Sequence, residues 1–112
     1  MSEDALWTIE FETTLGWANG GVVVLETGRL FGGDSQYYYV GRYNYAQPIY
    51  TAHVRVTHYQ GPLGTAWGDA AQTFDLALRG NIDPDSILIE GTIERQDFPT
   101  TRFRMLKRAP LP

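Results

Sequence analysis

The sequence of 112 residues contains no cysteine. This absence excludes disulfide bonds, thiolate catalysis and metal sites with cysteine ligands. Basic residues are also few, because nine Lys and Arg stand against 13 Asp and Glu and leave a formal net charge of −4 at pH 7. Affinity for a nucleic-acid backbone comes from clustered Lys and Arg, so we expect no direct nucleic-acid partner.

Long apolar runs are missing as well. Residues 1–4 are acidic and no apolar run follows them, so the sequence shows neither a secretory signal nor a membrane span. We therefore expect a cytoplasmic protein without a membrane partner. The composition, 43% hydrophobic and 20% charged, is that of a folded protein, and the length fits one domain.

Short segments in which apolar and polar residues alternate follow one another along the chain. Turn residues separate them, and no stretch has helical periodicity of useful length. The segments are residues 6–13, 21–26, 29–31, 37–43, 49–59, 73–79, 87–94 and 101–107. This order predicts an all-β fold, an eight-stranded antiparallel up-and-down β-barrel, with an open sandwich as the alternative.

Charge patterning on the first and last segments favours closure of the barrel. If these segments pair, outward Arg102 and Arg104 lie near outward Glu10 and Glu12. Opposite charges across strands contribute about 0.2–1 kcal/mol each, which helps to set the register. The inward side chains are bulky, so we expect a filled barrel or a narrow cavity. They include Trp7, Phe11, Tyr37, Tyr39, Tyr43 and Phe74.

Glycine, asparagine and proline mark the expected connections. Residues 16–21 predict the first hairpin turn and residues 80–84 a later turn. At Gly32 and Gly33 we expect a bulge or a sharp bend. Residues 61–70 form the one long connection, which the sequence allows to be either a short helical turn or a flap across one end of the sheet.

No residue constellation indicates catalysis or metal binding. His53 and His58 are five residues apart, so on a strand they point to opposite faces and would not share a metal. Asp83 and Asp85 lack the ligand spacing of a calcium loop. Asp34 follows two glycines, but no helix or Lys-Ser pair comes after it, so we expect its carboxylate to cap a turn. We therefore expect no enzyme activity, no metal and no cofactor.

Outward positions on three consecutive segments are apolar and would form one patch. Monomers seldom expose such a patch without a partner, so we predict that this face binds protein, either a second copy in a homodimer or a target. The alternative is that the N-terminal tail or the long connection covers it. The patch consists of Val22, Val24, Phe31, Tyr38 and Val40.

The stretch from Gly28 to Tyr45 carries a signature in which Gly-Gly-Asp is followed by three tyrosines and a glycine. Its structural positions are Gly32, Gly33, Asp34, Tyr39 and Gly41. Together with residues 6–11, 20–24 and 55–59, this order resembles the GrlR family, small negative regulators of type III secretion gene expression. The resemblance implies a single lipocalin-like (calycin) β-barrel domain over residues 1–112.

The resemblance also implies a function. Members of the family act without catalysis by binding another protein, and in the best-known members the partner is a transcriptional activator and an acidic surface loop is implicated. The matching positions here carry no charge and are Tyr45, Ala46, Gln47 and Pro48. The alternative function is binding of a small apolar ligand inside the barrel, which needs a cavity of several hundred cubic ångströms.

Overall fold

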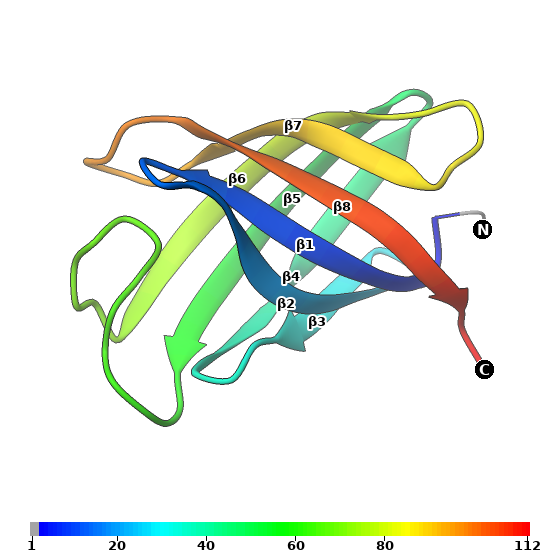
Figure 1. Cartoon of the computed structure of the whole chain (residues 1–112). Coiled ribbons are helices and arrows are strands. Elements are labelled where there is room, and N and C mark those ends of the chain that lie inside the picture. The colour runs from blue at the N-terminus through cyan, green and yellow to red at the C-terminus, as the bar shows by residue number, and fades with distance from the viewer. Residues whose placement is uncertain (1–2) are drawn as a thin grey trace.

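The computed structural model describes residues 3–112, and these residues form eight strands and no helix. The strands are β1 (Ala5–Thr13), β2 (Gly16–Glu26), β3 (Arg29–Gly33), β4 (Tyr37–Ala46), β5 (Ile49–His58), β6 (Thr73–Ile82), β7 (Leu88–Glu94) and β8 (Thr101–Pro110). Each strand pairs antiparallel with the next, and β8 pairs with β1 (Figure 1). The predicted closed, lipocalin-like barrel is therefore confirmed, and the open sandwich is excluded.

Closure between β1 and β8 has the predicted charge pattern. Arg104 lies opposite Glu10 in the register, and their Nε and Oε1 atoms are 2.6 Å apart. Arg102 binds Glu12 with an Nη2–Oε2 distance of 2.5 Å, and this hydrogen bond lowers the pKa of the Glu12 carboxyl. The ring of Trp17 packs over the Arg104 guanidinium at 4.1 Å. These contacts join the last strand to the first and favour the observed register.

Inward side chains fill the barrel. Trp7, Tyr50 and Phe103 are buried almost completely, and Tyr37, Tyr39 and Tyr43 of β4 are no more than 6% exposed. The space left at the centre is about 20 Å³, room for about one water molecule. The prediction of a filled barrel is therefore confirmed, except that Phe74 lies near one end and is only half-buried.

Two signature glycines allow neighbouring strands to approach closely. A Cβ atom at Gly32 would overlap the carbonyl oxygen of Val22 on β2, and one at Gly41 would overlap that of His53 on β5. Only glycine fits at such approaches. The register nevertheless continues unshifted from β2 through β3 to β4. Of the two features expected at Gly32 and Gly33, the bulge is therefore wrong, whereas the chain does bend directly after them, at residues 34–36.

The bulge lies on β2 instead. The β1–β2 register shifts between Thr8 and Glu10, where Gly20 and Gly21 fall inside the strand and Gly21 has a φ of +88°. The hairpin turn expected at residues 16–21 is therefore wrong, and the chain turns at residues 14–15. Asparagine and glycine suit a positive φ in a bulge as well as in a turn, so local sequence does not distinguish them.

The second expected turn is displaced as well. β6 continues through residues 80–82, and the chain turns at residues 83–87, where Asp83 Oδ1 accepts the backbone N–H groups of Ile87 and Leu88 at 2.8 and 2.7 Å. Gly80 lies within the sheet, and the position requires glycine because a Cβ atom there would overlap the Glu90 carbonyl oxygen of the neighbouring strand.

Within residues 3–112 no helix is long and apolar enough to cross a membrane.

The two ends of the barrel differ. One end carries both termini and short turns, and the other carries residues 34–36, 59–72 and 95–100 (Figure 1). Residues 59–72, which we call the flap, contain no helix and lie across this end, because Trp67 packs against Phe11 and Phe74. Of the two structures considered for the long connection, the flap is correct.

Candidate functional site

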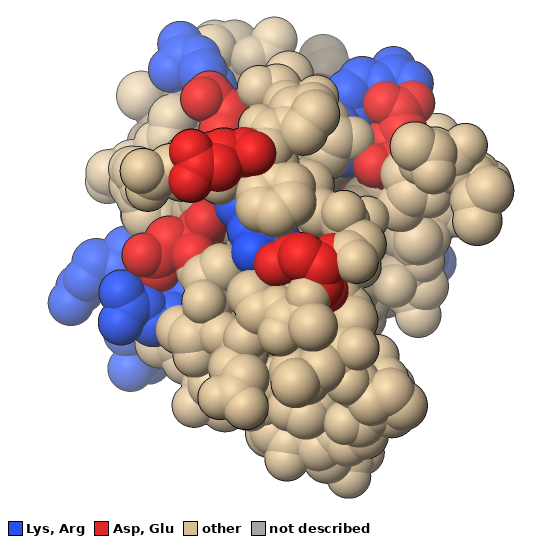
Figure 2. Space-filling model, turned by 90° about the vertical axis from the view of Figure 1, so that its left-hand side faces the viewer, with Lys and Arg blue, Asp and Glu red and all other residues tan. Residues whose placement is uncertain are grey.

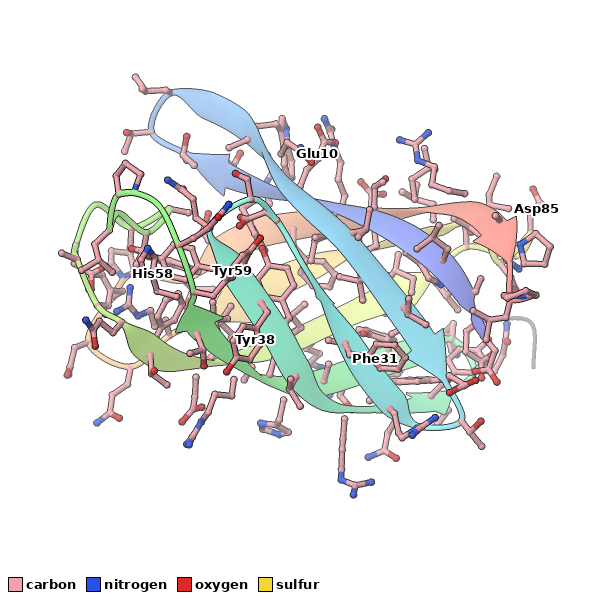
Figure 3. All side chains as sticks on the ribbon, turned by 90° about the horizontal axis from the view of Figure 1, so that it is seen from below. Glu10, Phe31, Tyr38, His58, Tyr59 and Asp85 are labelled. Atoms are coloured by element: carbon pink, nitrogen blue, oxygen red, sulfur yellow. The ribbon has the colours of Figure 1, made fainter. Side chains whose placement is uncertain are left out.

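The predicted outward patch lies on β2, β3 and β4 as expected. In the register Val24 faces Phe31, and Phe31 faces Val40. Figure 3 shows Phe31 and Tyr38 on the outside of their strands, with Tyr59 beside Tyr38. The exposed fractions of Val22, Phe31, Tyr38 and Val40 lie between 40% and 55%, and Val24 is half-buried.

The sequence missed one member of this patch. Tyr59 follows the end of β5, is exposed, and packs its ring 6.3 Å from that of Tyr38. We use the name outer patch for Val22, Val24, Phe31, Tyr38, Val40 and Tyr59. The flap leaves these side chains exposed, and Glu3 and Asp4 lie at the other end, where Asp4 accepts hydrogen bonds from Thr27 N and Tyr43 Oη. Nothing in residues 3–112 covers the outer patch.

Arginine side chains border the outer patch. Arg29 and Arg42 lie directly opposite each other on β3 and β4, and Arg55 lies opposite Val40. Arg29 pairs with Glu26 on the neighbouring strand. Like charges directly across a strand pair are unfavourable. Placing Arg29 opposite Arg42 therefore lowers the stability of the folded protein.

Arg42 stands out among these arginines. Its side chain is exposed and forms no ion pair with any residue of 3–112. Arg55 by contrast binds Asp75 at 3.0 Å. A shallow hollow of about 360 Å³ beside them is lined by Val40, His53 and Arg55, among others. The outer patch thus has a border of arginines in which Arg29 and Arg55 are balanced by carboxylates and Arg42 has no carboxylate partner within residues 3–112, on a protein of net charge −4.

The loop that matches the acidic loop of the GrlR family is a tight, uncharged turn. Tyr45, Ala46, Gln47 and Pro48 connect β4 to β5 at the end that carries the termini. The Gln47–Pro48 peptide bond is cis, and Tyr45 donates a hydrogen bond to the side chain of Gln47. The Pro48 carbonyl accepts Ile82 N–H at 2.9 Å. This turn presents no charge to a partner.

The remaining signature positions hold the turn between β3 and β4. Asp34 Oδ1 accepts the backbone N–H groups of Gln36 and Tyr37, both at 2.8 Å, so the predicted cap is confirmed. Tyr39 donates its hydroxyl to the Gly20 carbonyl at 2.6 Å. Burial, and next the nearby Asp34 carboxylate, raise the pKa of Tyr39, which therefore stays protonated.

A hollow lies beneath the flap at its end of the barrel, and the sequence analysis did not identify it. Its volume is about 220 Å³. Polar groups include Asn19, Asp34 and Gln36. Its aromatic lining consists of Phe11, Tyr37, Tyr39, Trp67 and Phe74. The one local signal was Trp67, an aromatic residue in a glycine-rich connection.

An ion pair fastens the flap over this hollow. The side chain of Arg95, on the loop after β7, is only 7% exposed and binds Asp69 through two parallel hydrogen bonds of 2.7 Å. Its guanidinium lies 4.0 Å from the Phe74 ring and 4.1 Å from the Phe98 ring. The Arg95 hydrogen bonds hold the pKa of the Asp69 carboxyl far below its ordinary value. Sequence gave no indication that these two residues meet.

Histidines and carboxylates do not assemble into a metal site in the described chain. Residues 3–112 contain no group of three or more His, Cys, Asp or Glu placed to hold a metal ion. His58 Nε2 lies 2.8 Å from the Gly61 carbonyl oxygen, and its ring packs against Tyr37. His53 is exposed on the opposite face of β5. These contacts give both histidines ordinary structural surroundings.

Comparisons with known proteins do not extend the family resemblance. No protein-family model matches the sequence, and no curated protein is significantly similar to it. Function must therefore be argued from the surfaces described above.

Proposed function

We propose that this barrel is a non-catalytic, cytoplasmic regulatory protein that acts by binding another protein through the outer patch. By its resemblance to the GrlR family, the partner is a transcriptional activator and the effect is negative regulation. The observation that carries the proposal is an exposed apolar face bordered by Arg42, which has no ion-pair partner among the described residues.

The apolar side chains supply the driving force for docking. Fully burying a valine or phenylalanine side chain contributes about 1.5–3 kcal/mol, so these half-exposed side chains contribute about 1 kcal/mol each. They are contiguous across three strands, because Val24, Phe31 and Val40 are successive cross-strand neighbours. Side chains that form one continuous patch can be covered by a single partner.

The charged border supports a proposal about the chemistry of the partner. Glu26 neutralises Arg29, whereas Arg42 has no ion-pair partner within residues 3–112. A carboxylate supplied from outside would balance the charge that remains on Arg42. The partner is therefore a protein segment with apolar side chains and at least one acidic group. Here the regulator would contribute the positive charge, whereas the surface loop implicated in the GrlR family is acidic. This difference is in keeping with the uncharged turn at Tyr45–Pro48.

The packed interior favours this function over the apolar-ligand alternative. Ligand pockets occupy about 300–1,000 Å³, whereas the space at the centre of the barrel is about 20 Å³. A ligand there would have to displace core side chains. In the predicted homodimer a second copy would bind the same outer patch, so it would compete with the partner protein for this surface.

Native mass spectrometry of the protein isolated gently from its host tests the proposal. We expect a complex with a different protein, lost in Val40→Glu and weakened at least about tenfold in Arg42→Glu, because both changes oppose an acidic, apolar partner. Leu106→Glu is the matched control, because Leu106 is an exposed leucine on β8, away from the outer patch.

Each alternative gives a different result. Masses at multiples of the protomer that disappear in Val40→Glu would identify a second copy as the occupant and overturn the acidic partner. A bare monomer in every preparation would overturn protein binding by this face. Equal capture by the Val40 and Leu106 variants would show that the captured protein binds elsewhere.

A further inference from the structure

The hollow under the flap is rich in aromatic faces. Figure 2 looks onto this end and shows a broad uncharged area in its lower part, where the flap lies. Aromatic faces carry negative potential and attract cations. Two of these rings already contact a cation, because the Arg95 guanidinium lies 4.0 Å from the Phe74 ring and 5.3 Å from the Trp67 ring. Arg95 does not line the hollow itself.

One carboxylate in the lining lacks a counter-charge. Asp34 Oδ1 is used by the turn, and the nearest side-chain donor to Oδ2 is the Tyr39 hydroxyl at 3.4 Å. A phenol has a single proton, and the 2.6 Å bond to the Gly20 carbonyl takes it. Within residues 3–112 Asp34 has no ion-pair partner. A part-buried carboxylate oxygen whose side-chain donor is as distant as 3.4 Å favours a cation beside it.

We propose that this hollow binds a small organic cation, an ammonium group bearing carbon substituents. Asp34 supplies the counter-ion, and the rings of Tyr37, Tyr39 and Trp67 surround the substituents. Ca²⁺ takes six to eight oxygen ligands, often from several carboxylates, whereas the lining of this hollow is largely aromatic and Asp34 is its one carboxylate. An anion would be repelled by Asp34, and a neutral apolar molecule would bring no counter-charge to its carboxylate. The site goes beyond the proposed function. It adjoins the outer patch, because the Tyr59 hydroxyl donates to the Asp34 carbonyl at 2.6 Å, but no outer-patch residue lines the hollow.

The volume sets the size of the ligand. A water molecule occupies about 30 Å³ of liquid, so about 220 Å³ accepts a molecule the size of choline. The flap closes over it, because Gly64 N–H donates to the Tyr37 hydroxyl at 3.1 Å and Asp69 binds Arg95. Trp67, between these two contacts, is thereby held at the hollow.

Binding is tested by NMR titration of the full chain with choline and with 3,3-dimethylbutan-1-ol, a neutral molecule of the same shape. We expect saturable shifts confined to the flap end with choline, and binding at least about tenfold weaker with the neutral alcohol. This comparison uses the unaltered protein, so it does not depend on the folding of a variant. Equal binding of the two molecules, or no shifts with choline, would overturn the proposal.

A matched pair of variants locates the charge. Asp34→Asn removes the charge but keeps an oxygen that can accept the Gln36 and Tyr37 N–H groups, so we expect a folded protein whose affinity for choline falls at least about tenfold. Asp83→Asn makes the same change in a capping aspartate at the opposite end and leaves the affinity unchanged. Unaltered affinity in Asp34→Asn would refute the role of Asp34.

Free choline and the headgroup of phosphatidylcholine share the required chemistry, and sedimentation with vesicles separates them. Binding of free choline without sedimentation on phosphatidylcholine vesicles identifies a soluble ligand. Sedimentation that free choline abolishes identifies the headgroup. Binding to neither would overturn the site.

Discussion

Removing the charge of Asp69 tests whether the ion pair with Arg95 holds the flap. Breaking a fully buried ion pair costs about 3–5 kcal/mol. The Asp69 side chain is 30% exposed and asparagine keeps one acceptor oxygen, so we expect Asp69→Asn to lower the free energy of unfolding by about 2 kcal/mol. For a chain of this size the melting temperature should fall by about 8 °C.

The assay is thermal unfolding followed by circular dichroism, with Asp75→Asn as the control. Asp75 pairs with Arg55 in the same chemical arrangement, but both side chains are more than 60% exposed. Water and salt screen such a pair, so its loss should leave the melting temperature nearly unchanged. Equal melting temperatures for the two variants would refute the reasoning that burial of Arg95 gives the flap contact its strength.

The pH dependence provides a second check on the same pair. The folded pKa of Asp69 is lowered by Arg95, so its contribution to stability is present above the ordinary aspartate pKa of about 4 and is lost as pH falls below it. The difference in stability between the native protein and Asp69→Asn should therefore narrow below pH 4. A constant difference down to pH 2 would contradict this assignment.

Two further predictions follow from the packing of the sheet. Gly41→Ala should destabilise the barrel by about 1–3 kcal/mol because its Cβ meets the neighbouring strand, whereas Gly64→Ala, in open space, should be neutral; equal denaturant midpoints would contradict this. Burial raises the pKa of Tyr39 and Tyr50, so above about pH 10 the unfolded state loses these protons first and stability falls. Tyrosinate absorbance from these residues should appear only together with loss of the circular-dichroism signal, and its appearance in the folded protein would refute their burial.

The sequence by itself determined the strands, their faces and the closure of the barrel. Alternation is a local property of period two, so the inward positions of Trp7, Tyr39 and Val54 could be derived from their neighbours in the chain. The outward positions of Phe31 and Val40 followed from the same rule. Complementary charges on the first and last strands indicated that these strands meet.

The positions of turns and bulges could be predicted less well from the sequence. Asn19, Gly20 and Gly21 tolerate positive φ in either feature, and the pairing of β2 with its neighbours decided that they form a bulge within the strand. Gly80 likewise has a role that depends on the Glu90 carbonyl of the adjacent strand. Such close approaches are defined by two strands together, so neither strand's sequence reveals them.

Only the tertiary structure assembled the flap end and the border of arginines. Asp69 and Arg95 are 26 residues apart, and the hollow gathers residues from β1, β2, β4, β5, β6, the turn between β3 and β4, and the flap. Within residues 3–112 Arg42 has no ion-pair partner, and this too depends on which side chains the neighbouring strands place around it. Local patterns record which face a side chain takes, whereas a binding site depends on which distant side chains share that face, and closure of the barrel decides this.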